Sequence, residues 1–484
     1  MTASAPSGKL MSGVSGVRGR VGEGLTPEVM TCLAAAHGAA LLERARAEAS
    51  GGRSVSPAVV LGRDSRTSGP MFRDAAVAGL LSVGCDVLDL GLAPTPTVLL
   101  TVRLLGALGG IVITASHNPV EWNAAKLVSG RGLFLTREES LRTLAVFESG
   151  GPPRVGWRDV GRLRPLDGYL EHHVERILRS PAVDPPAVEA RGFRVVLDVC
   201  HGVAGLLLEP LLRRLGCRVE SLHSEPSGLF PRNPDPAPAN LGELEARVRG
   251  CRADVGLALD PDGDRLALVS EQGRAVGEDL TLTLAVERVL THRGEAASPP
   301  PPVVTNLSTS RIVEDVAAAH GAEVVRTPVG EIHVAQRMLD LGSVVGGEGN
   351  GGVIYPEVHP TRDAGAAAAL VLSLLAAKGT GLVEAVAGYP SYGIVKETLG
   401  LEADRALDAA ALGQAFADAS VDVQDGMRFA WEAERAWLHV RRSGTEPIAR
   451  LIAEAPSRER AQQLVARARQ ILEPRPTGAA AARG

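Results

Sequence analysis

A unit of strand, turn and helix recurs three times along the 484-residue chain and constrains its fold more than any other feature. The apolar runs VVLG at 59–62, RVVLDV at 194–199 and VVTN at 303–306 each lead through a polar turn into a helical pattern. Units of this kind build sheets whose faces are covered by helices. The chain is also longer than the size at which single hydrophobic cores stop growing. The repetition predicts three similar α/β domains with mixed sheets, with one large sheet as the alternative.

The region after about residue 388 has a different pattern. Strand candidates at 429–434, 436–441 and 449–455 precede a helical stretch at 458–472, whose apolar residues share one face. This combination predicts a C-terminal α+β domain. We expect domains at 1–155, 156–272, 273–384 and 385–475 around a central cleft, followed by a disordered tail at 476–484.

Charge and composition argue against a nucleic-acid-binding protein, a membrane protein and a secreted protein with disulfides. The formal net charge is −5 and no stripe of basic residues is present, which disfavours nucleic acid binding. No apolar run approaches the roughly 18 residues of a membrane span, and the first residues lack the apolar core of a signal peptide. The five cysteines are odd in number and widely spaced, which disfavours a disulfide framework. We expect a cytoplasmic protein that is a monomer or a homodimer.

The segment TASHNP at 114–119 follows the apolar run LGGIVI, which places Ser116 at the exit of a buried strand. Open α/β sheets bind ligands at the ends of their strands. The Ser116 hydroxyl has two interpretations: it carries a phosphoryl group, or it caps a following helix. A phosphoryl carrier requires a cation, a phosphate clamp and sugar ligands elsewhere in the chain.

Three carboxylates, those of Asp260, Asp262 and Asp264, lie close together between two apolar runs. At about 4 Å each like pair costs roughly 1 kcal/mol in water and about 4 kcal/mol at an effective dielectric constant of about 20, so the cluster predicts a bound divalent cation. Oxygen ligands favour Mg²⁺ over zinc. A calcium EF-hand is the competing interpretation because Glu271 matches its twelfth position, but Arg265 stands where its sixth position needs glycine. Arg265 is also a candidate contact for the phosphate or the sugar.

Two further segments offer ligands for a phosphorylated sugar. The stretch HVRRSGTEPIAR gathers cationic and hydroxyl side chains around a glycine turn, which suits a phosphate dianion, although such turns also occur as plain loops. The glycine-rich GEGNGG offers a carboxylate and an amide to sugar hydroxyls, and the turn at 327–331 is expected to face the same cleft. The candidate substrate-binding residues of these segments are Thr327, Gly330, Glu348, Asn350, Arg441, Ser443, Gly444, Thr445 and Arg450.

These segments occur in one order over nearly the whole chain, and together they resemble the α-D-phosphohexomutase family of phosphoglucosamine mutases, phosphomannomutases and phosphoglucomutases. TASHNP is similar to the family's phosphoserine loop and DPDGDR to its metal loop. GEGNGG resembles the sugar-recognition loop, and RRSGTEP resembles the phosphate-binding loop of the last domain. VSGVRG and FPRNPDPAPANL are also similar to family segments.

The resemblance implies roles for individual residues. Ser116 is the expected phosphoserine and, with the three aspartates, the expected ligand set for Mg²⁺. Lys126 is a candidate general acid or base, and Arg18 matches a position near the transferring phosphate. The expected catalytic residues are Ser116, Lys126, Arg18 and His117.

Three positions depart from the pattern of many family members. Asn350 replaces a serine, Gly352 stands where a histidine is common, and Glu331 occupies a position that is basic in some phosphomannomutase-type members. The GEGNGG and SGTEP forms look more like those of phosphoglucosamine mutases than those of the dual phosphomannomutase/phosphoglucomutase enzymes.

We therefore expect a Mg²⁺-dependent phosphohexomutase that moves phosphate reversibly between the 6- and 1-positions of a hexose through phosphoserine and a bisphosphate intermediate. Glucosamine 6-phosphate is the preferred substrate of this hypothesis, with phosphomannomutase/phosphoglucomutase activity as the alternative. The expected partners are the phosphorylated hexose or hexosamine and its 1,6-bisphosphate. A phosphosugar-binding sensor on the same fold is the non-enzymatic alternative.

Overall fold

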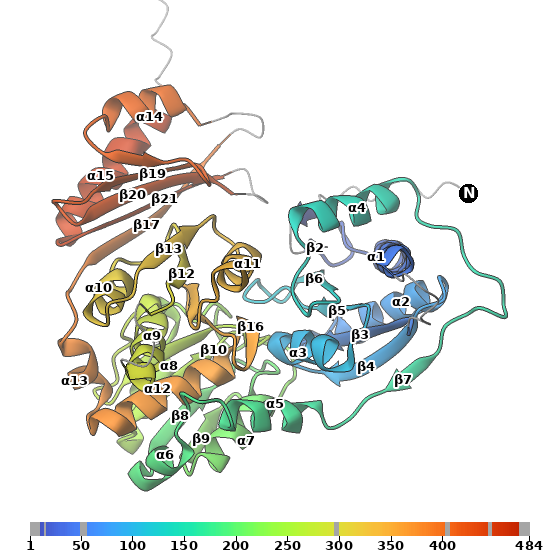
Figure 1. The fold of residues 1–484 in the computed structure, drawn as a ribbon, viewed down its shortest axis with the longest axis horizontal. Helices are drawn as coiled ribbons and strands as arrows, with labels where there is room; N and C mark the ends of the chain where they lie inside the picture. Colours follow the sequence, from blue (N-terminus) through green and yellow to red (C-terminus); the bar gives the residue numbers. More distant parts are fainter. Residues whose placement is uncertain are drawn as a thin grey trace, which may run out of the picture.

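The structure is a computed structural model that describes residues 10–13, 16–48, 56–294, 300–401, 407–443 and 448–473. Its strands form four sheets that follow one another along the chain (Figure 1). The expected disordered tail at 476–484 lies outside the described residues.

The first sheet has the strand order β1-β2-β6-β5-β3-β4-β7, and parallel and antiparallel pairs are mixed in it. Val59 and Leu61 face a core beneath two helices on one side, whereas Val60 faces the third helix on the other side. This alternation explains why the apolar run at 59–62 forms a strand whose two faces are both covered by helices. The strands are β1 (Met11–Gly13), β2 (Gly16–Arg20), β3 (Ala58–Arg63), β4 (Asp86–Leu92), β5 (Gly109–Ile113), β6 (Trp122–Ser129) and β7 (Leu163–Pro165). The helices are α1 (Pro27–Glu48), α2 (Gly69–Leu81), α3 (Thr95–Leu105) and α4 (Arg137–Glu148).

The second sheet has three parallel strands and one antiparallel edge strand, in the order β11-β10-β8-β9. Its chain starts after β7, which pairs with β4 of the first sheet and lies beyond the expected domain limit at residue 155. The strands are β8 (Arg194–Asp198), β9 (Arg218–Leu222), β10 (Val255–Leu259) and β11 (Leu266–Ser270). The helices are α5 (Tyr169–Leu178), α6 (Pro185–Arg191), α7 (Gly205–Arg214), the 3-10 helix η1 (Pro238–Asn240) and α8 (Gly242–Cys251).

The third sheet is also mixed and has the order β13-β12-β14-β15-β16. Its last two strands form antiparallel pairs next to the parallel ones. The strands are β12 (Val303–Asn306), β13 (Val324–Thr327), β14 (Gly346–Glu348), β15 (Gly352–Tyr355) and β16 (His359–Arg362). The helices are α9 (Glu278–Arg293), α10 (Ile312–Ala319), α11 (Glu331–Leu341), α12 (Ala364–Lys378) and α13 (Leu382–Ala387).

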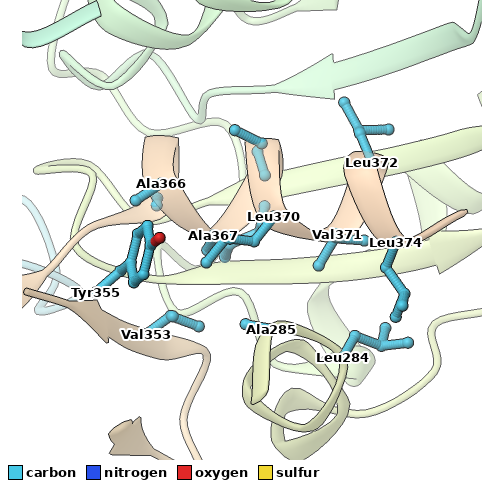
Figure 2. Packing of buried hydrophobic residues seen from close by; sticks show 14 of the residues in the cluster. Leu284, Ala285, Val353, Tyr355, Ala366, Ala367, Leu370, Val371, Leu372 and Leu374 are labelled. Carbon is cyan, nitrogen blue, oxygen red and sulfur yellow. The ribbon is translucent and has the colours of Figure 1, made fainter. Parts of the chain in front are cut away.

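Helix α12 joins the cores beneath the second and third sheets. Its residues from Ala364 to Leu375 are all buried, so the helix is apolar on every side. It contacts α9 and β15 of the third unit and also α5, α6 and α7 of the second unit. Figure 2 shows Leu370 and Val371 of α12 packed beside Ala285 of α9. A helix that is apolar all round is stable only inside such a core, and here one core serves two sheets.

The last sheet is antiparallel throughout, in the order β17-β21-β20-β19-β18. Helix α15 spans the residues predicted for it, and the Ser457 side chain accepts a hydrogen bond from the Arg460 amide at its start. The strands are β17 (Gly393–Gly400), β18 (Ser420–Asp422), β19 (Met427–Trp431), β20 (Ala436–Arg442) and β21 (Ile448–Ala455), and the helices are α14 (Ala409–Ala415) and α15 (Arg458–Leu472).

The prediction of three mixed-sheet α/β domains and a C-terminal α+β domain is confirmed by these four sheets. One large sheet, the alternative, is wrong. Within the part of the chain that the structure describes, no helix combines the length and apolar character needed to cross a bilayer.

Candidate active site

Ser116 lies just after the fully buried strand β5 and points its hydroxyl at the metal loop of the second domain. Its Oγ donates a hydrogen bond to Asp260 Oδ2 at 2.7 Å, and its amide donates to Thr114 Oγ1 at 2.9 Å. The chain continues into strand β6, and no helix begins between Ser116 and Trp122. The helix-cap interpretation of Ser116 is therefore wrong.

The three aspartates form a compact buried cluster between β10 and β11. Asp260, Asp262 and Asp264 are each 0% exposed, and they offer carboxylate oxygens within 4.8 Å of one another. Among the described residues, one oxygen of Asp262 and one of Asp264 have no hydrogen-bond partner. Burial, followed by the charges of its two neighbours, raises the pKa of Asp260 well above its usual value. Buried carboxylate oxygens that accept no hydrogen bond are suitable ligands for a hard divalent cation, so these residues fit Mg²⁺.

Glu271 does not join the cluster, although the EF-hand interpretation requires it there. Its carboxylate accepts hydrogen bonds from the Leu382 and Val383 amides at 3.1 and 3.3 Å, at the start of α13. The aspartate loop is flanked by the two antiparallel strands β10 and β11 in place of helices. The EF-hand interpretation is therefore wrong.

Lys126 lies on β6 with its ammonium group beside the aspartates. Its Nζ is 2.7 Å from Asp262 Oδ2 and 3.7 Å from Asp264 Oδ2. Burial lowers the pKa of Lys126, but the two carboxylates outweigh it and the net shift is upward. Burial likewise opposes ionisation of Asp262, yet Lys126 holds its pKa below the usual value. The pair is therefore ionic, with a protonated ammonium group on Lys126.

His117 and Arg18 lie near Ser116 and line the same pocket. The Nδ1 atom of His117 is 3.3 Å from Ser116 Oγ, and burial followed by the charge of Arg265 holds the pKa of His117 well below its usual value. Arg18 on β2 approaches Asn118 Oδ1 with Nη1 at 3.5 Å. One pocket is lined, among others, by Arg18, Ser116, His117, Lys126, Arg265 and Arg362.

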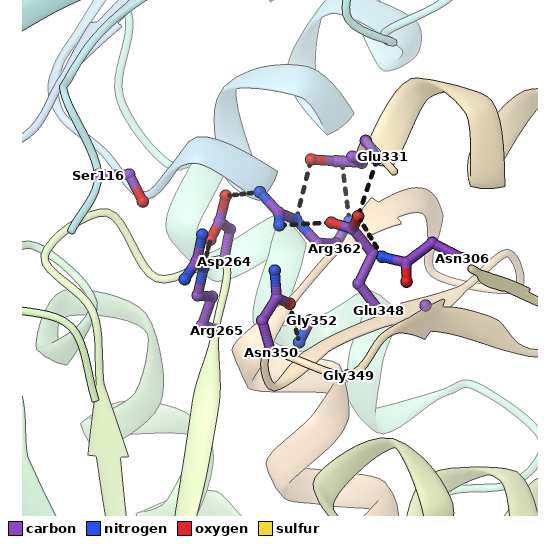
Figure 3. A network of polar contacts seen from close by, with 12 residues as sticks. Ser116, Asp264, Arg265, Asn306, Glu331, Glu348, Gly349, Asn350, Gly352 and Arg362 are labelled. Atoms are coloured by element: carbon purple, nitrogen blue, oxygen red, sulfur yellow. Dashed lines mark hydrogen bonds and ion pairs between the residues drawn. The ribbon is translucent and has the colours of Figure 1, made fainter. Parts of the chain in front are cut away.

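Glu348 ends strand β14 and is 3% exposed, with hydrogen bonds to both of its oxygens. Its Oε1 accepts from Asn306 Nδ2 at 2.8 Å and from the Gly330 amide at 3.1 Å, and its Oε2 accepts from Arg362 Nη1 at 2.7 Å (Figure 3). Burial opposes ionisation, but Arg362 and Asn306 lower the pKa of Glu348 below its usual value. A sugar hydroxyl would therefore meet a carboxylate that is ionised and already oriented.

The other predicted residues of the third domain are held by local bonds. Asn350 Oδ1 accepts a hydrogen bond from the Gly352 amide at 3.2 Å. The Thr327 hydroxyl donates to Pro328 O at 3.0 Å and is buried. Gly330 has a φ of +132° and uses its amide to orient Glu348.

Arg362 lines the pocket but was not among the residues predicted from the sequence. At the end of β16 it donates from Nη2 to Asp264 Oδ2 at 2.7 Å and from Nε to Glu331 Oε2 at 3.1 Å, in addition to its bond with Glu348 (Figure 3). It joins the metal loop to the sugar-recognition loop. The signal in the sequence was the surplus of carboxylates in the two loops, since buried carboxylates are costly unless a cationic side chain lies beside them.

Gly352 makes room for this arginine. A Cβ atom at Gly352 would lie 2.2 Å from Arg362 Cδ, which is far inside van der Waals contact. A side chain at Gly352 would exclude the observed position of Arg362.

The predicted phosphate-binding residues of the last domain are only partly described. Arg441 on β20 and Arg450 on β21 are directly paired across the two strands, and Arg441 Nη1 is 3.6 Å from Asp425 Oδ2. Burial lowers the pKa of Arg441, and the carboxylates of Asp425 and Glu348 oppose that shift. Ser443 follows β20, whereas Gly444 and Thr445 lie outside the described residues.

Comparison with known proteins agrees with the four-domain architecture. Four models of the phosphoglucomutase/phosphomannomutase family match the chain: alpha/beta/alpha domain I at residues 9–150, domain II at 167–273, domain III at 274–392 and the C-terminal domain at 396–471.

Curated relatives match over nearly their whole length. The chain is 39% identical over 459 residues to a probable phosphoglucosamine mutase of Methanopyrus kandleri, covering 93% of this chain and 95% of the relative. It is 37% identical over 469 residues to a phosphoglucomutase/phosphomannomutase of Thermococcus kodakarensis, covering 96% and 99%. A crystal structure of a phosphoglucomutase/phosphomannomutase family protein from Burkholderia thailandensis superposes with a TM-score of 0.79 at 27% identity, covering 96% of this chain and 97% of that one. The chain therefore belongs to the phosphoglucomutase/phosphomannomutase family of phosphohexomutases, which are isomerases.

Proposed function

We propose that this protein is a Mg²⁺-dependent mutase that moves phosphate between the 6- and 1-positions of a hexosamine through phosphorylated Ser116. The observation that carries the proposal is the 2.7 Å hydrogen bond from Ser116 Oγ to Asp260. It places a nucleophilic oxygen of the first domain against a buried carboxylate cluster of the second domain. A phosphoryl group on that oxygen would lie at the cation site.

Asp260, Asp262 and Asp264, with a phosphoryl oxygen on Ser116, would hold Mg²⁺. When bound, the cation neutralises phosphoryl oxygens and stabilises charge that develops during transfer. One buried oxygen of Asp262 and one of Asp264 accept no hydrogen bond within the described residues, and these oxygens are available to the cation.

Side chains of the protein would donate and accept the protons that move in the reaction. When the phosphorus–oxygen bond at Ser116 breaks and a new bond forms to a sugar hydroxyl, that hydroxyl loses one proton and Ser116 Oγ gains one. Lys126 is held in its charged form by two carboxylates, which suits proton donation to Ser116. His117 is held neutral beside the same oxygen, which suits acceptance of the Ser116 proton in the return transfer, when Ser116 Oγ attacks the sugar phosphate. The sugar bisphosphate then turns over and returns its other phosphate to Ser116.

Positioning of the sugar is assigned to Glu348 and Asn350 and that of the distal phosphate to the last domain, through Arg441, Ser443, Gly444, Thr445 and Arg450. Arg265 and Arg18 line the pocket on the serine side. Thr327 and Gly330 act through local structure, since the hydroxyl of Thr327 and the amide of Gly330 are already bonded.

Glucosamine phosphate is the proposed substrate, and relatives named phosphoglucosamine mutase support it. Mannose and glucose phosphates are the second candidates because a relative with 37% identity is named phosphoglucomutase/phosphomannomutase. Turnover of glucosamine, mannose and glucose 1-phosphates with one bisphosphate activator ranks the three sugars. Equal rates on all three would contradict the glucosamine preference.

Mass spectrometry of Ser116 together with a coupled mutase assay tests the chemistry. We expect a phosphorylated serine and Mg²⁺-dependent turnover. A phosphorylated protein that binds the sugar phosphates without turning them over would instead be a sensor.

A further inference from the structure

Arg66 is fully buried directly beneath the serine loop, the name used here for residues 114–122. Its Nη2 donates to Ser116 O and to Asn118 O at 2.6 Å each, and its Nη1 donates to Pro119 O at 2.6 Å and to Trp122 O at 3.0 Å. The side chain is 0% exposed. One guanidinium group therefore binds four main-chain oxygens of the loop that carries the nucleophile.

Asp64 closes this arrangement into a ring. Its Oδ2 accepts from Arg66 Nε at 3.0 Å and from Thr114 Oγ1 at 2.6 Å. Thr114 Oγ1 in turn accepts from the Ser116 amide at 2.9 Å. With the bond to Asp64, all five N–H donors of the guanidinium are matched to acceptors.

The ring holds a strained backbone. Ser116 has a φ of +49°, in the left-handed region that residues other than glycine enter at a cost. Such a conformation persists only where the surrounding contacts determine it. The acceptors of Arg66 in the loop are main-chain carbonyls, which cannot turn away as side chains can.

A second segment ties this ring to the metal loop. The Phe230 ring lies 4.9 Å from the Arg66 guanidinium carbon. Arg232, two residues later, donates from Nε to Asp198 Oδ2 at 2.6 Å and from Nη2 to Leu259 O at 2.9 Å. Leu259 immediately precedes Asp260. The segment from Phe230 to Arg232 thus contacts the supports of both loops.

We propose that Arg66 is a positioning residue that sets the direction of Ser116 Oγ relative to the metal loop. The proposal rests on the proposed mutase function and deepens it. It names a residue that fixes the distance between Ser116 Oγ and the aspartates, which neither the serine nor the aspartates define alone. Arg66 touches no reacting atom. Its effect should therefore be seen in the rate of phosphoryl transfer more than in sugar binding.

The test is the Arg66→Lys variant, which keeps the charge next to Asp64 but cannot reach four carbonyls. Because a displacement of about 1 Å can cost about 10²-fold in rate, we expect kcat to fall about 10²-fold while KM changes by less than about threefold. Arg288→Lys is the matched control: Arg288 is also buried and donates to a main-chain oxygen, Ala182 O at 2.7 Å, but lies outside the site. An unchanged kcat in Arg66→Lys, or equal losses in both variants, would overturn the proposal.

Thr114→Val gives a second measurement that does not depend on the folding of the arginine variant. It removes the hydroxyl between Asp64 and the Ser116 amide. We expect kcat to fall about tenfold and KM to stay within about threefold of the wild-type value, because the variant disturbs the geometry of phosphoryl transfer and leaves sugar binding intact. If Arg66→Lys does not fold, a fully active Thr114→Val variant overturns the proposal. A wild-type protein without mutase turnover would refute the proposed function itself, whereas normal wild-type turnover with normal variants refutes only the role of Arg66.

Discussion

The serine loop and the sugar-recognition loop each rest on one buried arginine, but the two arginines have different acceptors. Four of the bonds from Arg66 go to main-chain oxygens of the serine loop. The bonds of Arg362 go to the side chains of Asp264, Glu331 and Glu348. Main-chain acceptors fix a loop in one geometry. Carboxylates can rotate and exchange partners when a cation or sugar hydroxyl arrives.

The difference separates two requirements of a mutase. In the proposed mechanism the nucleophile keeps one direction in both halves of the cycle, which suits the bonds of Arg66. The sugar loop would accept a substrate in two orientations, which suits charged side chains whose partners can change. Each prediction below disturbs one of the two sides.

Ser116→Ala removes the proposed phosphoryl carrier and has the largest expected effect. We expect kcat to fall by at least about 10⁴-fold, as when a nucleophile is deleted from other enzymes. A coupled assay with Mg²⁺ and a bisphosphate activator measures it. Ser180→Ala is the control, because the buried Ser180 hydroxyl donates only to Ile177 O and lies outside the site. Turnover within tenfold of wild type in Ser116→Ala would rule out the phosphoserine.

Arg362→Met removes the cation shared by three buried carboxylates. Loss of one partner from a buried ion pair costs about 3–5 kcal/mol, so we expect a large fall in the thermal midpoint and in turnover. Addition of Mg²⁺ should raise that midpoint more in the variant than in wild type, because the cation compensates Asp264 when the arginine is missing. Differential scanning calorimetry with Mg²⁺ and with EDTA measures both shifts.

The buried Arg288 supplies the control for this variant, as Arg288→Met. It should lower the thermal midpoint without a change in the response to Mg²⁺. An identical response to Mg²⁺ in wild type and in Arg362→Met would contradict the proximity of Arg362 to the cation site.

Gly352→Ala tests the same arginine with a single methyl group. The new Cβ would lie 2.2 Å from Arg362 Cδ, so the arginine must shift. Overpacking of this kind costs about 1–3 kcal/mol, and we expect turnover to fall about tenfold. The control is Gly250→Ala on α8, where an added Cβ meets no atom within 4 Å. Full activity of Gly352→Ala would show that Arg362 can leave its position freely.

Asp279 adds a pH dependence to the sugar-loop side and has the smallest expected effect. It lies under the loop, since a Cβ at Gly349 would be 2.1 Å from Asp279 Oδ1, and burial raises the pKa of Asp279 to about 6. A carboxyl whose folded pKa is raised contributes stability that is complete below its unfolded pKa and is lost as the pH rises through about 6.

Asp279→Asn should therefore stabilise the protein more at pH 8 than at pH 5, by about 1–2 kcal/mol. Thermal midpoints of wild type and variant at the two pH values measure this difference. A gain that is the same at both values would show that Asp279 does not titrate between them.

Local motifs made part of the site predictable from the sequence. Ser116 and the three aspartates are found where they were expected because strand exits and short carboxylate spacings are local properties. The helix at 458–472 was predictable for the same reason, since its apolar face repeats within the segment.

Long-range contacts could not be predicted in this way. Arg362 and Asp264 are 98 residues apart, and Arg66 and Ser116 are 50 residues apart. Glu348 looked like a free sugar ligand because its partners, Asn306 and Arg362, come from other strands. The hydrogen-bond acceptors of a single arginine in a turn cannot be predicted from the residues around it, because the packing of the sheets brings those acceptors close.

The apolar helix α12 also has a consequence for the way the chain is made. The second sheet ends with Ser270 on β11, but the core on one of its faces is completed by residues 364–378 of α12. At roughly 5–20 residues per second of synthesis, a nascent chain would wait on the order of ten seconds before this helix leaves the ribosome. Until then the leucines of α7 lack their contacts with α12, so apolar surface of the second domain stays exposed to water while the third domain is synthesised.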